Sequence, residues 1–394
     1  MMSNIAVVCA FPPDRNTGMY TVDYSAARFF AETFPAESVS FYCLGDPDRA
    51  GYDLEKRPVA YKPLHRHLDD LHAADLIVYW GDFLQSKGYW DADLCGWLVR
   101  DGIASTKAEA ENLVYRALML EDAPDAVLGR VLIFGGTIIT IGAIELSDTR
   151  YRTALERMLR LAKGVYFRDA ISAAKADPYR GGRSALGIDC ALLLRPEDYA
   201  AADLPLPAAA NSGSRLRLGV FFGRAKWIVQ PLAFSRMLAK KLDAEATWVP
   251  WLGSAPRQLP LARAAGYPAS SKPPLPQDIF PVLATCNFIV SDTYHLCVNA
   301  WNIGIPTICL GYGAERIAHT LGDKKKETLF SMNGAAPFYV YRESIANPTN
   351  LRSAVAHAAQ MLRDSAATDI VRTSIRAQSA AAREKLLSAC LAEM

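Results

Sequence analysis

One histidine lies between two apolar runs in the stretch SDTYHLCVNAWNIGIPTICLGYG, residues 291–313. The preceding run NFIV reads as a strand, and Asp292 or Thr293 suits a helix N-cap, so His295 is expected in that helix's first turn. A first turn favours anions, and an imidazole beside a bound anion can act as a general acid. The alternative is a histidine with only a packing or capping role. The strand-end position favours catalysis, with Asp292 orienting the imidazole or accepting a hydroxyl proton.

Charged residues follow two further strand-like runs. Arg168 and Asp169 follow GVYF, and Arg224 follows RLGVFFG. A guanidinium binds carboxylate or phosphate through two parallel hydrogen bonds, so both arginines are candidate anion-binding residues and Asp169 a candidate catalytic carboxylate. For the Arg168 and Asp169 pair, the alternative is a structural salt bridge, or a helix-capping aspartate beside a surface arginine.

Three other strand-end loops are candidates for lining a binding site. Asn16 and Gly18 lie in DRNTGM, and Asp82 lies in GDF; we expect these residues on the acceptor side. The alternative is that these loops only reverse the chain direction, as most loops of this kind do, and that Asp82 caps a helix. Gly311 belongs to a loop, residues 311–313, that returns the chain to the level of His295.

The elements that position these residues alternate between strand and helix, which indicates parallel strands with crossovers. We predict an α/β fold of two Rossmann-like domains with mostly parallel sheets facing a cleft, of glycosyltransferase B type, with C-terminal helices packing across. The expected boundaries are 1–200 (acceptor side), a Pro, Ala, Gly and Ser-rich linker 201–215, 216–349 (donor side) and helical 350–394. Strands are predicted within residues 5–11, 38–44, 74–84, 130–140, 164–167, 217–223, 246–252, 287–292 and 306–313.

Composition excludes several functions for this chain of 394 residues. Lys plus Arg is 43 against 41 acidic residues, so a net charge of +2 gives no reason to expect a nucleic-acid partner. The eight cysteines form no CxxC pair and read as reduced, and no run suits a signal peptide or membrane span. We therefore expect a cytoplasmic protein with at most peripheral membrane contact.

For three other polar or glycine-containing segments, the sequence predicts no catalytic or binding role. No metal is expected, because the three histidines of PLHRHLDDLH have no nearby cysteine and read as solvent-facing. GGT in RVLIFGGTII is no phosphate-binding P-loop. The run GDKKKE, residues 322–327, reads as a solvated loop.

Together these residues resemble a known family. NFIVSDTYHLCVNAWNIGIPTICLGYG is similar to the C-terminal signature of the polysaccharide pyruvyl transferases: a strand, Arg-x-His, an Ala-containing helix, Gly-x-Pro and a strand ending in Tyr. GVYFRDAISAAK resembles the family's element of Arg-Asp and a later Ser, here Arg168, Asp169 and Ser172. LGIDCALLL resembles its next, Asp-containing strand.

The resemblance implies an enzyme that transfers pyruvate from phosphoenolpyruvate, a co-substrate rather than a cofactor, onto a sugar as a ketal in cell-surface polysaccharide biosynthesis. The acceptor would be a sugar, a nucleotide-sugar or a lipid-linked glycan. Thr293 stands where the family has Arg. Arg224 or one of Lys324 to Lys326 would replace that charge by reaching into the cleft, and without such a residue phosphoenolpyruvate is not expected as the donor. Tyr294 and Tyr312 complete the donor side. Alternatives are a glycosyltransferase with a nucleotide-sugar donor and a non-catalytic glycan- or anion-binding relative.

Overall fold

The computed structural model describes residues 4–10, 16–47, 58–201, 215–223, 228–251, 258–267, 276–313 and 321–392. The chain divides by its contacts into two compact units. Unit 1 comprises residues 1–13, 19–193 and 379–394, and unit 2 comprises 14–18 and 194–378. Each unit holds one parallel sheet, which confirms the predicted α/β class with two Rossmann-like halves.

The sheet of unit 1 has seven strands in the order β3-β2-β1-β4-β5-β6-β7, and all its pairs are parallel. Every residue of β1, β4 and β5 is buried, as expected for central strands covered on both faces. The order reverses between β1 and β4, where such sheets commonly bind ligands. The strands are β1 (Ile5–Cys9), β2 (Val39–Cys43), β3 (Tyr61–Pro63), β4 (Leu76–Asp82), β5 (Val131–Gly136), β6 (Gly164–Phe167) and β7 (Ala185–Leu186).

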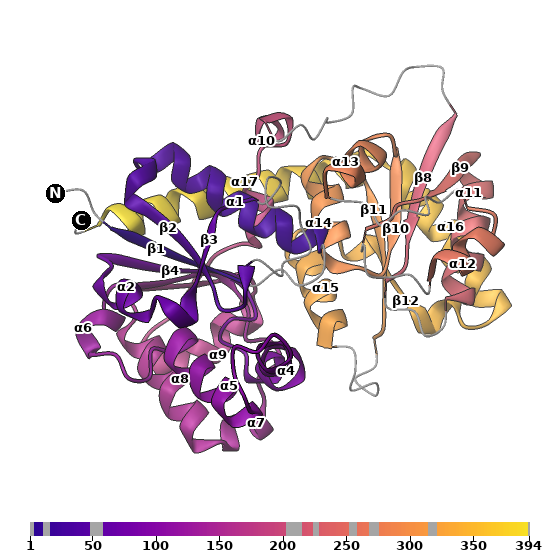
Figure 1. The fold of residues 1–394 in the computed structure, drawn as a ribbon. Helices are drawn as coiled ribbons and strands as arrows, with labels where there is room; N and C mark the ends of the chain where they lie inside the picture. The colour runs from indigo at the N-terminus through magenta and orange to yellow at the C-terminus, as the bar shows by residue number, and fades with distance from the viewer. Residues whose placement is uncertain are drawn as a thin grey trace. The chain divides into compact units, whose positions relative to one another are not determined.

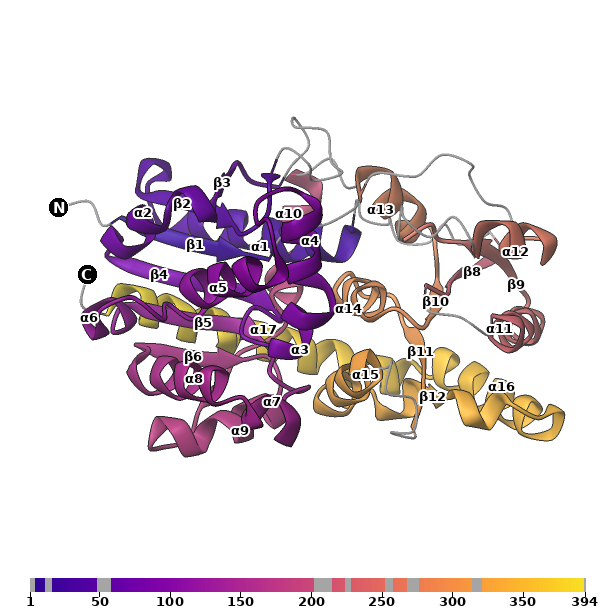
Figure 2. The same ribbon diagram turned by 60° about the horizontal axis from the view of Figure 1, so that its bottom comes forward.

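Helices cover both faces of this sheet. Figures 1 and 2 show α5 and α8 on one face, and α1 with the C-terminal part of α17 on the other. In α8 the apolar spacing buries Tyr151, Leu155 and Met158 on one side of the helix. The helices are α1 (Thr17–Thr33), α2 (Leu68–Ala73), α3 (Lys87–Tyr89), α4 (Cys95–Arg100), α5 (Lys107–Leu118), α6 (Asp125–Leu128), α7 (Ala143–Ser147), α8 (Thr149–Leu161) and α9 (Ala170–Arg180).

The sheet of unit 2 has five parallel strands in the order β12-β11-β10-β8-β9. The order reverses between β8 and β10, so the carboxyl ends of these two strands form the second expected ligand-binding position. The strands are β8 (Leu216–Phe221), β9 (Ala244–Trp248), β10 (Phe288–Ser291), β11 (Thr307–Gly311) and β12 (Tyr339–Tyr341).

The helices of unit 2 include the predicted C-terminal pair, which breaks at Asp364. Helix α16 packs along α11, and α17 runs from unit 2 into unit 1 (Figure 1). Among the described residues, none of the helices combines the length and apolarity needed to cross a membrane. The helices are α10 (Pro196–Ala201), α11 (Val229–Leu242), α12 (Gln258–Ala264), α13 (Pro276–Ala284), α14 (Tyr294–Asn302), α15 (Leu321–Met332), α16 (Pro348–Arg363) and α17 (Ser365–Leu391).

The contact-based units differ from the expected domain boundaries at three places. Residues 14–18 and 194–200 group with unit 2, and residues 379–394 group with unit 1. Side-chain hydrogen bonds explain two of these differences: Asn302 donates to the carbonyl of Leu194, and Ser379 donates to the carbonyl of Leu192. Most of the expected linker, residues 202–214, lies outside the described part of the chain.

The segment LGIDCALLL is not the strand that the resemblance implied. Strand β7 ends at Leu186, and residues Cys190–Leu193 form a short 3-10 helix. Asp189 causes the turn, because its carboxylate accepts from the backbone N–H of Ala191 and its carbonyl from that of Leu192.

Candidate functional site

Four neighbouring strands of unit 2 each end beside a residue of one connected cluster. Gly223 follows β8, Asp292 follows β10, Tyr312 follows β11 and Arg342 follows β12. Because all these strands are parallel, their carboxyl ends meet at one edge of the sheet. The cluster therefore lies where the strand order reverses.

Asp292 is the centre of this cluster. Its Oδ1 accepts from the Gly223 backbone N–H at 2.8 Å and from the Thr293 hydroxyl at 3.3 Å, and its Oδ2 accepts from Arg342 Nη2 at 3.2 Å. The side chain is 3% exposed. Thr293 occupies the N-cap position of α14, but its side chain makes no capping hydrogen bond. Asp292 therefore ties β8, β10 and β12 together at their ends.

Arg342 is the cation that balances Asp292. Its side chain is 7% exposed, Nη1 donates to the Tyr312 hydroxyl at 3.1 Å, and Cζ lies 5.1 Å from the centre of the Tyr312 ring. Sequence reasoning missed this residue, because 50 positions separate it from its carboxylate partner. The only signal was its place directly after the short run FYVY.

The lysines of GDKKKE are not in a solvated loop, so that prediction was wrong. They lie in the first turns of α15, and two of them, Lys325 and Lys326, are buried. Lys326 is 2% exposed; Nζ donates to the carbonyls of Asp292 at 2.8 Å and Leu310 at 3.2 Å and pairs with Asp323. Lys325 is buried, with Nζ 4.7 Å from the centre of the Tyr294 ring. Lys324, the predicted donor-side residue, is exposed.

His295 is the second residue of α14, in the first turn, as the residues around it predicted. It is 9% exposed and its ring lies 5.0 Å from that of Tyr294, centre to centre. The imidazole also packs on Gly18: a Cβ atom there would lie 2.5 Å from both Cβ and Cγ of His295 and would also meet Nδ1. Asn16 Oδ1 accepts from the Gly18 N–H at 3.0 Å, so two of the three predicted acceptor-side residues, Asn16 and Gly18, are in contact, and Gly18 lies against the histidine.

Arg168 and Asp169 have the contacts of structural residues in unit 1. Arg168 Nη1 donates to buried Asp189 at 2.8 Å. Asp169 caps α9: Oδ1 accepts from the Ser172 N–H, and Oδ2 accepts from the hydroxyls of Thr137 and Ser172, each at 2.7 Å. One alternative was a helix-capping aspartate beside a surface arginine. Asp169 does cap a helix, but Arg168 is buried and not on the surface.

Asp82 is the last residue of β4, not the helix cap that was the alternative prediction. It is buried and its φ of 51° is left-handed, and four residues separate it from α3. Sequence reasoning missed a second carboxylate, Asp23 in α1, which accepts from the Tyr61 hydroxyl. Burial raises the pKa of Asp23 well above its ordinary range, and the charge of Asp82 raises it further.

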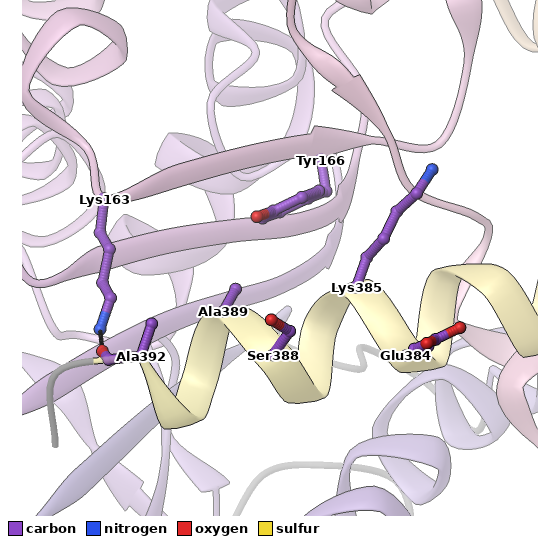
Figure 3. Close-up of a pocket in the computed structure, with 7 residues that line it drawn as sticks. All are labelled: Lys163, Tyr166, Glu384, Lys385, Ser388, Ala389 and Ala392. Carbon is purple, nitrogen blue, oxygen red and sulfur yellow. Dashed lines mark hydrogen bonds between the residues drawn. The ribbon is translucent and has the colours of Figure 1, made fainter.

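A pocket of about 670 Å³ in unit 1 contains none of the predicted site residues (Figure 3). It lies between α17 and β6, where Lys163 donates to the carbonyl of Ala392. Arg224 lies outside the described residues, and within those residues no group of His, Cys, Asp and Glu is placed to hold a metal. The pocket is lined by Lys163, Tyr166, Glu384, Lys385, Ser388, Ala389 and Ala392.

Comparison with known proteins identifies one family. A sequence profile described as "Polysaccharide pyruvyl transferase" matches residues 24–314. No curated protein matches the chain in sequence.

Solved structures share the fold at low identity. The structure of S. aureus MnaA with UDP has a TM-score of 0.54 and 10% identity, and covers 98% of this chain and 95% of its own. The UDP-GlcNAc 2-epimerase from Neisseria meningitidis, bound to UDP-GlcNAc, has a TM-score of 0.51 and 12% identity, and covers 98% and 100%. Similarity at this level establishes the glycosyltransferase B-like fold.

Proposed function

Because the chain belongs to the polysaccharide pyruvyl transferase family, we propose that it transfers the pyruvyl group of phosphoenolpyruvate to a sugar. The observation that carries this proposal is a set of buried charged residues at the strand ends of unit 2, where His295 also lies in the first turn of α14. The set comprises Arg342, Lys325 and Lys326 against Asp292 and Asp323, an excess of one positive charge. Such a cluster suits a donor that carries both a carboxylate and a phosphate.

The reaction would consume two sugar hydroxyls. The methylene carbon of phosphoenolpyruvate gains a proton and becomes a methyl group, and C2 becomes electron-poor. Both hydroxyl oxygens form bonds to C2, and the bond from C2 to the phosphate oxygen breaks. One hydroxyl proton replaces the proton given to the methylene carbon, and the other leaves with inorganic phosphate. The product is a cyclic ketal of pyruvate.

His295 is the proposed general acid that protonates the methylene carbon. It lies in the first turn of α14, directly after Tyr294, whose ring contacts Lys325, so the proposal puts a proton donor beside an anion-binding helix N-terminus. A general acid contributes about 100- to 10,000-fold, so we expect His295→Ala to lower kcat by that factor with the fold intact. The contacts of Asp292 favour a positioning role, which is to hold Arg342.

The remaining predicted residues have supporting roles in this proposal. Asn16 and Gly18 would approach the acceptor sugar, since Gly18 packs against His295 and donates its N–H to Asn16. Asp82 of unit 1 remains a separate candidate for binding the acceptor. Asp169 and Arg168 would hold the loop after β6 in place. The sugar would belong to a polysaccharide under synthesis, as the family name implies.

Thermal denaturation with candidate donors tests the proposal. At about 100 times Kd, phosphoenolpyruvate should stabilise the protein by about 2.7 kcal/mol, and release of phosphate should depend on an added sugar acceptor. UDP-GlcNAc at the same concentration is the control. Stabilisation by UDP-GlcNAc without any by phosphoenolpyruvate would favour a nucleotide-sugar transferase instead. Binding of phosphoenolpyruvate without turnover by any acceptor would favour a non-catalytic relative.

A further inference from the structure

We propose that Arg342 binds the anionic group of the donor. This inference rests on the proposed function and names a donor-binding residue for it. Arg342 directly follows β12 and lies at the same sheet edge as Thr293, where it forms an ion pair with Asp292. The ligand it would hold is a carboxylate or phosphate oxygen pair.

Two contacts hold the guanidinium in a fixed orientation. Asp292 Oδ2 accepts from Nη2 at 3.2 Å, and the Tyr312 hydroxyl accepts from Nη1 at 3.1 Å. The Tyr312 ring also lies 5.1 Å from Cζ, which is within the range of a cation–π contact. An arginine that is already oriented loses less side-chain entropy when it binds an anion.

The same guanidinium retains hydrogen-bonding capacity. A guanidinium has five N–H donors, and Nε of Arg342 is buried with no hydrogen-bond partner among the described residues. Leaving a buried donor of a charged group unpaired is costly, and an anion that accepts from Nε would remove that cost. If Arg342 only connected the ends of β12 and β10, its contact with Asp292 would be enough. That role does not explain the unpaired Nε donor.

The neighbouring lysines are less suited to the role. Lys326 already directs its ammonium group at three acceptors, the carbonyls of Asp292 and Leu310 and the carboxylate of Asp323. Lys324 is exposed on α15. An ammonium is also a point charge, whereas a guanidinium matches the two oxygens of a carboxylate or phosphate.

Titration calorimetry with phosphoenolpyruvate tests this inference in the full-length chain. Arg342→Lys retains a cation beside Asp292 but loses the guanidinium group that can bind two oxygens at once, so we expect Kd to rise about 10- to 100-fold in a variant that still shows a cooperative melting transition. Adding Thr293→Arg to that variant should restore most of the affinity. The matched control is Arg372→Lys, because Arg372 donates to Gly304 and Asp369 rather than to Asp292 or Tyr312.

The outcomes separate this inference from the proposed function. If the wild type binds no phosphoenolpyruvate, the proposed function fails and this inference with it. If the wild type binds it and folded Arg342→Lys binds equally well, only the role of Arg342 is refuted. Should Arg342→Lys not fold, Tyr312→Phe removes the acceptor of Nη1 and should raise Kd about fivefold. An unchanged Kd in Tyr312→Phe would then refute the role.

Discussion

The substitution Gly18→Ala tests whether the position of His295 matters for the reaction. Gly18 lies in the first turn of α1, and the imidazole of His295 packs directly on its backbone. A methyl group at Gly18 would lie 2.5 Å from both Cβ and Cγ of His295, whereas ordinary van der Waals contact begins at 3.4 Å. Because His295 Cβ is fixed by helix α14, rotation of the ring alone does not relieve this overlap.

The difference between these two distances sets the expected effect. Gly18 and His295 must separate by about 1 Å, and a misplacement of that size costs about 100-fold in rate when it affects a reacting group. Overpacking a buried site also costs about 1–3 kcal/mol of unfolding free energy. We therefore expect kcat to fall about 100-fold while the protein still folds.

The assay combines phosphate release from phosphoenolpyruvate with urea denaturation. Gly182→Ala is the matched control, because a methyl group there would meet no atom within 4 Å, and both quantities should be unchanged. A Gly18→Ala enzyme with wild-type kcat would refute the reasoning, because it would mean either that His295 moves without consequence or that it takes no part in the reaction.

Three further variants test the buried charges. Lys326→Met should lower the unfolding free energy by about 3–5 kcal/mol, because it leaves Asp323 buried and unpaired. The control Lys324→Met changes an exposed residue and should cost less than about 0.5 kcal/mol, and equal effects of the two variants would contradict the burial of Lys326. Asp169→Ala should cost about 2–4 kcal/mol in urea denaturation, since it removes a helix cap and two hydroxyl contacts, and a neutral result would mean that the cap is not formed. The pKa of Asp23 is raised in the folded protein. The stabilisation that comes from protonation of Asp23 is therefore complete below about pH 4 and is lost as pH rises toward the folded pKa. Relative to Asp23→Asn, the wild type should lose about 1.4 kcal/mol per pH unit over that range in denaturation at several pH values, and a constant difference would contradict a raised pKa.

The sequence predicted those structural features that depend on residues close together in the chain. Strand β10 and the start of α14 follow from an apolar run and the polar pair Asp292 and Thr293, so the place of His295 was predictable. The alternation of strands and helices likewise gave the two parallel sheets.

The long-range contacts of the site were not predictable in this way. Whether a lysine in GDKKKE is solvated depends on which face of α15 meets the ends of β10 and β11, and the short charged run contains no such information. Arg342 pairs with a carboxylate 50 positions earlier, and Arg168 with one 21 positions later. Only the packing of the strands brings these partners together.

The most direct test of the central claim is the nuclear magnetic resonance signal of the His295 imidazole during titration with phosphoenolpyruvate. The signal would be assigned by its absence in His295→Gln. If the donor binds beside this residue, the signal should shift and saturate at one ligand per chain. A signal that stays unchanged while calorimetry shows phosphoenolpyruvate bound would contradict the proposed site.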